Sequence, residues 1–184
     1  MPIEFSDKES IYFELEQISP DAVLDGFDCS VPEYNDYLVR NALRSAQDNI
    51  AVTWLLRKRE TGEIAAYMSL VADAVKLSIT EKERHNLNYP FKTIPAMKIA
   101  KLAVSRVFRQ TYSGIGSFMI KTAQYIARSC NNNYFAVRFL TVDADIEHDE
   151  RVLSFYEKNG FILNTELYNK KRKTISMRFD LYIV

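Results

Sequence analysis

The spacing of apolar side chains predicts alternating strands and helices over the second half of the chain. Residues 94–104 are mostly apolar and predict a strand, and residues 134–142 are apolar nearly throughout, which is typical of a strand covered on both faces. Between them, residues 114–130 carry apolar side chains at roughly helical spacing. Residues 149–158 predict a second helix, and an apolar strand begins at Phe161.

The first half predicts antiparallel strands. Residues 10–18 alternate between apolar and polar, and residues 51–58 and 64–74 form two runs joined by a turn at 60–63. The last strand, 174–182, alternates cleanly and is expected at an exposed edge, where it could pair with a second subunit. We therefore predict an α+β fold with a mixed sheet. Three further segments are a turn or short helix at 20–26, a helix from Ser30 or Pro32 to about Asp48, and a short helix at 79–86.

Length and composition predict a single domain that spans residues 1–184. The polar, acidic N-terminus is unlike a signal peptide, and no run of about 18 apolar residues could span a membrane. The two cysteines, Cys29 and Cys130, lie far apart and match no metal-ligand spacing. We therefore expect reduced thiols, no bound metal and a cytoplasmic location.

Charge is balanced over the whole chain but unevenly distributed. The 24 basic and 24 acidic residues cancel, yet residues 92–128 contain seven basic residues and no acidic one. Two interpretations stay open: basic side chains that simply cover solvated faces, and a site for a polyanion of limited size. The overall neutrality argues weakly against long nucleic acid as the main ligand. The seven residues are Lys92, Lys98, Lys101, Arg106, Arg109, Lys121 and Arg128.

A glycine pair, Gly114 and Gly116, stands where a loop after the strand 94–104 leads into the helix 114–130. The first amides of a helix have no intrahelical acceptors, and the helix dipole adds partial positive charge, so a pyrophosphate fits such a place. The pair matches neither a Walker loop nor a full dinucleotide fingerprint. The alternative is that the two glycines only cap the helix and allow close packing.

Tyr156 lies near the end of the helix 149–158, just before Asn159 and Gly160. Acetyl transfer from a thioester to an amine passes through an oxyanion and expels a thiolate, which a nearby phenol can protonate. The other explanation is a core tyrosine packed beside Phe155 and Phe161.

Three segments in this order, LAVSRVFRQTYSGIGSFMIKTA, YFAVRFLTVDA and DERVLSFYEKNGF, resemble the GNAT superfamily of N-acetyltransferases. The resemblance implies a GNAT-like, mostly antiparallel sheet with helices on both faces and two splayed parallel strands, 96–104 and 134–142. Acetyl-CoA would lie between these strands, its pyrophosphate on the amides of 112–117 and its pantetheine near Val104. Tyr156 would be the general acid. The cofactor-binding residues implied are Ala103, Val104, Arg109, Gln110, Thr111, Tyr112, Ser113, Gly114, Ile115, Gly116, Ser117 and Asp149.

A narrower resemblance covers nearly the whole chain. The segments FDCSVPEYNDYLVRNA, TWLL, AYMSL and IPAMKIAKLAV are similar to the GNAT branch that contains aminoacyl-tRNA-acetylating toxins. It implies the amino group of an aminoacyl-tRNA as acceptor and an antitoxin as partner. A small metabolite amine, a protein N-terminus and a non-catalytic acyl-CoA-binding module remain the alternatives.

Several residues depart from these family patterns. Thr111 stands where the superfamily has Arg or Gln, which predicts weaker cofactor affinity. Asp149 stands where Asn is usual, and an ionised Asp accepts hydrogen bonds but donates none. Ser30 and Ala66 replace glycines of the branch motif. No general base is visible, because strand 94–104 carries no carboxylate and we expect the two histidines, His85 and His148, at the surface.

Overall fold

The computed structural model describes residues 2–164 and 173–182. The chain divides into two compact units, which we call the first unit (residues 1–71 and 100–122) and the second unit (residues 72–99 and 123–184). Two strands, β4 (Ile64–Lys76) and β5 (Thr93–Val104), continue from one unit into the other. The single domain therefore stays a prediction. No helix in the described part of the chain is both long enough and apolar enough to cross a membrane.

The first unit contains the predicted antiparallel hairpin. Strand β3 (Val52–Lys58) pairs with β4, and β2 (Phe13–Gln17) pairs antiparallel with the other side of β3. The Lys58 N–H donates to the Glu63 carbonyl at 2.9 Å, which closes the turn of the hairpin. A separate parallel pair joins β1 (Ile3–Glu4) to β6 (Tyr112–Ser113).

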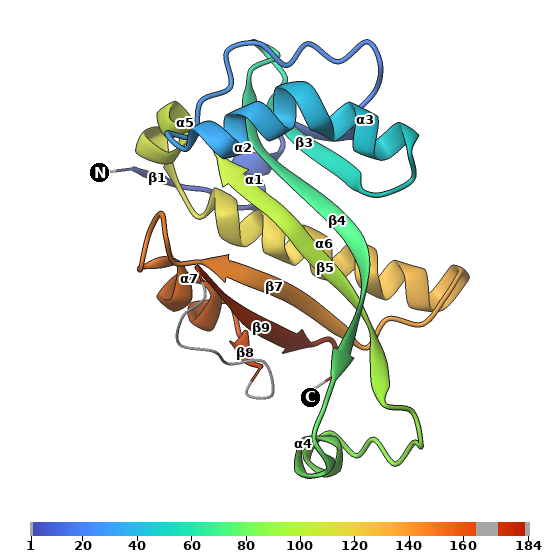
Figure 1. Cartoon of the computed structure of the whole chain (residues 1–184). Helices are drawn as coiled ribbons and strands as arrows, with labels where there is room; N and C mark the ends of the chain where they lie inside the picture. Colours follow the sequence, from blue (N-terminus) through green and yellow to red (C-terminus); the bar gives the residue numbers. More distant parts are fainter. Residues whose placement is uncertain (1, 165–172, 183–184) are drawn as a thin grey trace. The chain divides into compact units, whose positions relative to one another are not determined.

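The helical segment of the first unit begins at Pro32, the second of the two predicted starts. Pro suits the first helical position, because its missing N–H has no acceptor there anyway. The segment consists of α2 (Pro32–Asp36), a π-helical turn η1 (Tyr37–Asn41) and α3 (Ala42–Gln47). Its buried side chains pack on β3, β4 and β5, and α2 and α3 follow one another in Figure 1. The buried cluster is Phe27, Cys29, Leu38, Ala42, Leu55, Ile64, Tyr67 and Ala103. Helices α1 (Asp7–Ser10) and α5 (Arg106–Thr111) complete this unit with the start of α6 (Ile115–Asn133).

The second unit contains the predicted parallel pair. Residues Ala96–Ile99 of β5 pair parallel with residues 139–142 of β7 (Phe139–Asp145), and β7 pairs antiparallel with β9 (Thr174–Asp180). The strand order in this unit is β5-β7-β9-β8, where β8 is Ile162–Leu163 (Figure 1). The α+β class and the mixed, mostly antiparallel sheet are thus confirmed. The helices of this unit include α4 (Ile79–Arg84), α7 (Val152–Lys158) and the rest of α6, from residue 123 on.

Two strand predictions are wrong in the second unit. Strand β7 begins at Phe139 and not at Tyr134, and the side chains of Tyr134 and Phe135 are exposed. Strand β9 is not an edge strand, because β8 pairs with it at Met177 and Arg178. An isolated apolar run does not reveal which of its residues the neighbouring strand pairs with. Strand β9 therefore has no open edge at Met177 and Arg178 with which a second subunit could pair.

Candidate active site

The segment between β5 and the glycines is a helix and not the predicted loop. Ser105 is buried, and its N–H donates to the Ala65 carbonyl at 2.8 Å, which fixes the end of β5. Helix α5 follows at once and ends at Thr111, where the Tyr112 N–H donates back to the Phe108 carbonyl. The Thr111 hydroxyl donates to the Val107 carbonyl at 3.0 Å. This side chain therefore caps its own helix turn.

The glycine turn opens α6, as predicted. Gly114 has φ +96°, a left-handed conformation that side chains other than glycine rarely adopt. Its carbonyl accepts the Phe118 N–H at 2.9 Å, so the first three amides of the helix, at 115–117, lie ahead of the intrahelical ladder. Gly116 does not have a positive φ. Gly114 is thus the glycine that the backbone requires.

Two residues of the predicted run 112–117 take part in other backbone contacts. The Tyr112 N–H is used by Phe108, and Tyr112 and Ser113 form β6 against β1. The Ser113 carbonyl accepts the Phe5 N–H at 2.7 Å. Of the predicted run, the amides at 115–117 are the ones that lie at the start of α6.

The cationic side chains near this turn in the sequence differ in exposure and pairing. Arg109 and Lys121 are exposed, and so is Gln110. Arg106 forms an ion pair with Asp28 at 3.4 Å. The remaining residues of the basic stretch divide between the two units, and Lys98 is paired with Asp143 in the second. The basic residues of 92–128 therefore do not all belong to one unit, and two of them, Lys98 and Arg106, are paired with carboxylates.

The end of β5 carries the two predicted pantetheine neighbours. Ala103 is buried in the core of the first unit, and Val104 is half-buried as the last strand residue.

The segment FYEKNGF folds as a Schellman motif in the second unit. The Phe161 N–H donates to the Tyr156 carbonyl at 3.0 Å, and the Gly160 N–H donates to the Glu157 carbonyl at 2.9 Å, with Gly160 at φ +83°. The ring of Tyr156 contacts Phe161 at 5.3 Å between centroids and Phe155 at 5.1 Å. Tyr156 is 5% exposed. The motif thus explains why an aromatic residue stands at each end of the turn.

Asp149 precedes α7, and its carboxylate is bound within the chain. Arg151 donates to it through its backbone N–H at 3.0 Å and through two guanidinium nitrogens at 2.9 and 3.0 Å. The hydrogen bond and the charge of Asp149 raise the pKa of Arg151. The Asp149 side chain is therefore not arranged as a donor toward a pantetheine amide.

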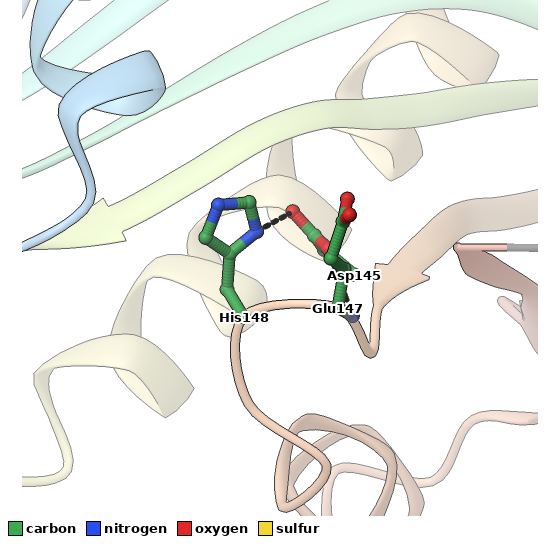
Figure 2. A group of neighbouring side chains, drawn as sticks. All are labelled: Asp145, Glu147 and His148. Carbon is green, nitrogen blue, oxygen red and sulfur yellow. Dashed lines mark hydrogen bonds and ion pairs between the residues drawn. The ribbon is translucent and has the colours of Figure 1, made fainter.

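Figure 2 shows three polar side chains that converge after β7. His148 Nδ1 lies 2.9 Å from Asp145 Oδ2, and Glu147 lies beside them. Glu147 forms an ion pair with Lys173 at 2.7 Å. The other histidine, His85, is not at the surface as expected: its side chain is only 6% exposed, and its Nδ1 lies 2.7 Å from Asp180 Oδ2. Sequence spacing gives no signal for a pair of residues 95 positions apart.

Comparisons with known proteins identify the fold. No protein-family model and no curated protein matches the chain. The solved structure of AtaT complexed with acetyl-methionyl-tRNAfMet matches with a TM-score of 0.76 and 20% identity, over 91% of this chain and 94% of that chain. A tyrosine-to-phenylalanine mutant of KacT matches with a TM-score of 0.73 and 18% identity, over 91% of this chain and 95% of that chain. An AtaT mutant toxin bound to the C-terminus of the antitoxin AtaR and acetyl-CoA matches with a TM-score of 0.70 and 20% identity, over 92% and 93%.

These matches confirm the resemblance at the level of the fold. The chain has the fold of AtaT and KacT over about nine tenths of its length.

Proposed function

We propose that this chain is an acetyl-CoA-dependent N-acetyltransferase that acts on a primary amine. The observation that carries the proposal is the glycine turn, where Gly114 at φ +96° opens α6 ahead of three helix amides. Structures with this fold include one bound to acetyl-CoA and one with an acetylated aminoacyl-tRNA, which supports the same chemistry here.

The first unit supplies groups that suit the diphosphate of coenzyme A. The amides at 115–117 offer hydrogen-bond donors at the positive end of a 19-residue helix. The exposed guanidinium of Arg109 adds charge from the preceding helix. Val104 would hold the pantetheine by its backbone. Acetyl-CoA supplies the acetyl group as an activated thioester, and these residues bind and orient it.

The second unit supplies the proposed general acid, Tyr156. A phenol has a pKa near 10 and can donate a proton to a departing thiolate. The backbone of the Schellman motif and the rings of Phe155 and Phe161 hold this side chain in one orientation. Solved structures of both AtaT and KacT are tyrosine-to-phenylalanine mutants, which supports testing the same change here.

For the acceptor we propose the amino group of an aminoacyl-tRNA. The AtaT complex with acetyl-methionyl-tRNAfMet favours this acceptor, and the AtaT complex with AtaR favours an antitoxin as protein partner. A small metabolite amine or a protein N-terminus is the alternative acceptor, and the zero net charge of the chain is compatible with it.

Tyr156→Phe tests the proton-donor role. We expect the rate of thiol release from acetyl-CoA with an accepted amine to fall about 100-fold or more, because general acid catalysis contributes about 10²–10⁴-fold. The ring contacts with Phe155 and Phe161 remain, so the variant should stay folded, with a loss of stability of at most about 1–3 kcal/mol for the buried hydroxyl. The matched control is Tyr125→Phe, since Tyr125 is 72% exposed on α6.

The outcomes separate the competing functions. Full activity of Tyr156→Phe with every accepted amine would end the proton-donor role. Calorimetry with coenzyme A separates the acetyltransferase from a non-catalytic binding module. Binding without any turnover by the wild type supports the binding module. No binding of coenzyme A overturns both the acetyltransferase and the binding module.

A further inference from the structure

An apolar pocket of about 350 Å³ lies within the second unit, where three segments of the chain meet. Its walls come from the segment after α4, the segment between α6 and β7, and the residues after β9. They include Tyr89, Phe91, Val137, Arg138 and Tyr182, and we call the site the aromatic pocket. The volume falls in the range of small-ligand sites, about 300–1,000 Å³. None of the residues proposed to bind acetyl-CoA lines this pocket.

The rim of the aromatic pocket exposes flat ring faces. The side chains of Tyr89 and Phe91 are 57% and 63% exposed, and Tyr182 is also exposed. The rings of Tyr89 and Phe91 lie nearly parallel, with planes 16° apart and centroids at 6.3 Å. Exposed apolar groups gathered around a hollow mark an interaction site. Nearly parallel ring faces suit a planar ligand that stacks on them.

Buried polar contacts hold the walls of the pocket together. The buried carboxylate of Asp180 lies 2.7 Å from His85 Nδ1 and accepts a hydrogen bond from Arg138 at 2.8 Å. It therefore joins the segment after α4 to the segment before β7. Lys82 on α4 donates to the Phe91 carbonyl. The pocket is thus supported by side chains from several elements and not by one loop alone.

The charge around the aromatic pocket is positive. Arg138 lies over the Tyr182 ring at 5.4 Å, and Arg128 donates to the Leu181 carbonyl at 3.2 Å. Lys92 follows Phe91 and is exposed. Within residues 2–164 and 173–182, neither Lys92 nor Arg128 has a carboxylate oxygen within 4.0 Å. Their charges therefore stay available to an anion from outside the chain.

Ring faces beside unpaired cations are the combination with which proteins bind single-stranded nucleic acid. Bases stack on the aromatic side chains, and the cations attract the phosphates. In a duplex the bases are stacked on one another, so an unpaired base is the one that reaches such a ring. An apolar peptide would need buried volume, which aliphatic side chains supply equally well, and would not need cations at the rim. The observations therefore favour a nucleic-acid strand over a peptide.

We propose that the aromatic pocket binds an unpaired base of a single-stranded nucleic acid, stacked on the ring of Phe91, with neighbouring phosphates at Lys92 and Arg128. These two cations belong to the basic stretch 92–128, so part of that stretch serves a polyanion of limited size. The proposal goes beyond the proposed function and does not depend on acetyl transfer, because its residues lie outside the proposed acetyl-CoA site.

The experiment measures binding of the whole chain to fluorescein-labelled hexa-adenylate by fluorescence anisotropy, without acetyl-CoA. A hexamer of the same ribose-phosphate backbone without bases should bind about tenfold more weakly or worse, since stacking of a base on an aromatic ring contributes affinity beyond charge. Phe91→Leu keeps an apolar side chain but removes the ring, so it should lose about tenfold in affinity for hexa-adenylate and none for the abasic hexamer. Phe91→Tyr should retain the wild-type affinity.

Tyr125→Leu is the matched control, because Tyr125 is 72% exposed in the same unit and does not line the pocket. It should bind both hexamers as the wild type does. The deoxy form of hexa-adenylate distinguishes the sources of the strand: tighter binding of the ribo form assigns RNA to the site, and tighter binding of the deoxy form assigns DNA.

Equal affinities of the wild type for hexa-adenylate and the abasic hexamer overturn the proposal, whether or not the variants fold. An absence of binding, or an equal loss in Tyr125→Leu and Phe91→Leu, overturns it as well. Sedimentation supplies the remaining outcome: self-association that Phe91→Leu abolishes, with unchanged affinity for hexa-adenylate, assigns this face to a second copy of the chain. Thiol release from acetyl-CoA measures the proposed function separately, so the failure of either one leaves the other standing.

Discussion

At the residue scale, Ser30 shows how this chain replaces a glycine. Its φ is +73°, in the left-handed region where the resembling branch has glycine. The Ser30 N–H donates to Asp28 Oδ1 at 2.8 Å, and the Asn35 side-chain amide donates to the same oxygen at 3.1 Å. These hydrogen bonds, from Ser30 and then Asn35, lower the pKa of Asp28. The local network thus holds a backbone conformation that serine disfavours.

Ser30→Gly should stabilise the protein. Glycine adopts this φ without steric cost, so we expect the free energy of unfolding to rise by about 1 kcal/mol. Urea denaturation followed by circular dichroism measures the change. Ser45→Gly is the control, because Ser45 lies in helix α3, where glycine should destabilise by about 1 kcal/mol. If Ser30→Gly instead lowers the free energy of unfolding, the backbone at Ser30 is not strained.

At the element scale, α7 ends where it does because of Gly160. The residue combines φ +83° with a close neighbour, since a Cβ added there would lie 2.9 Å from Cε2 of Phe179 on β9. The Schellman turn therefore sets the end of the helix and lets it pack against β9. The same turn fixes the backbone of Tyr156.

Gly160→Ala should destabilise the second unit by about 2–3 kcal/mol, the sum of the left-handed strain and the contact with Phe179. Thermal unfolding measures it. Gly26→Ala is the matched control, because Gly26 has a nearly identical φ of +82° but nothing within 4 Å of the added Cβ. It should cost about 1 kcal/mol from strain alone. If the two variants lose the same free energy of unfolding, the Phe179 ring moves aside without cost and the contact adds nothing.

At the scale of the whole molecule, a buried ionic network joins distant parts of the second unit. Arg178 on β9 is 3% exposed and donates to Glu81 on α4 at 2.7 Å and to Asn164 at 2.6 Å. Burial alone raises the pKa of Glu81, but hydrogen bonds from the N–H and hydroxyl of Ser78 and from Arg178 together lower it to about 2. Glu81 also closes a capping box with Ser78 at the start of α4.

This network should make stability depend on acid pH. Because the pKa of Glu81 is lowered from its ordinary 4.5 to about 2 in the folded state, its stabilisation is complete above about pH 4.5 and is lost as pH falls toward 2. Glu81→Gln should cost about 1–3 kcal/mol at pH 7 and flatten the pH dependence in that window. Melting temperatures from pH 2 to 7 test this. Glu83→Gln, exposed on the same helix, should leave the profile unchanged.

Local sequence predicted the features that depend on near neighbours. The hairpin at 60–63, Pro32 at the start of α2 and Gly114 at the start of α6 follow from backbone preferences of single residues. The motif NGF likewise specifies the turn after α7 through two hydrogen bonds within six residues. These turns and helix ends could be predicted because the residues that form their hydrogen bonds lie close together in the chain.

Tertiary structure alone decided the rest. The pairs of Glu81 with Arg178 and of His85 with Asp180 join residues more than ninety positions apart, and no spacing rule links such residues. The pairing of β8 with β9 is likewise set by packing. So is the contact of the Lys101 ammonium group with the rings of Tyr34 and Tyr37. The sequence by itself determined where backbone turns and helix ends fall, since those depend on local dihedral energies. Which charges are paired and which remain available was decided by side-chain packing between distant segments.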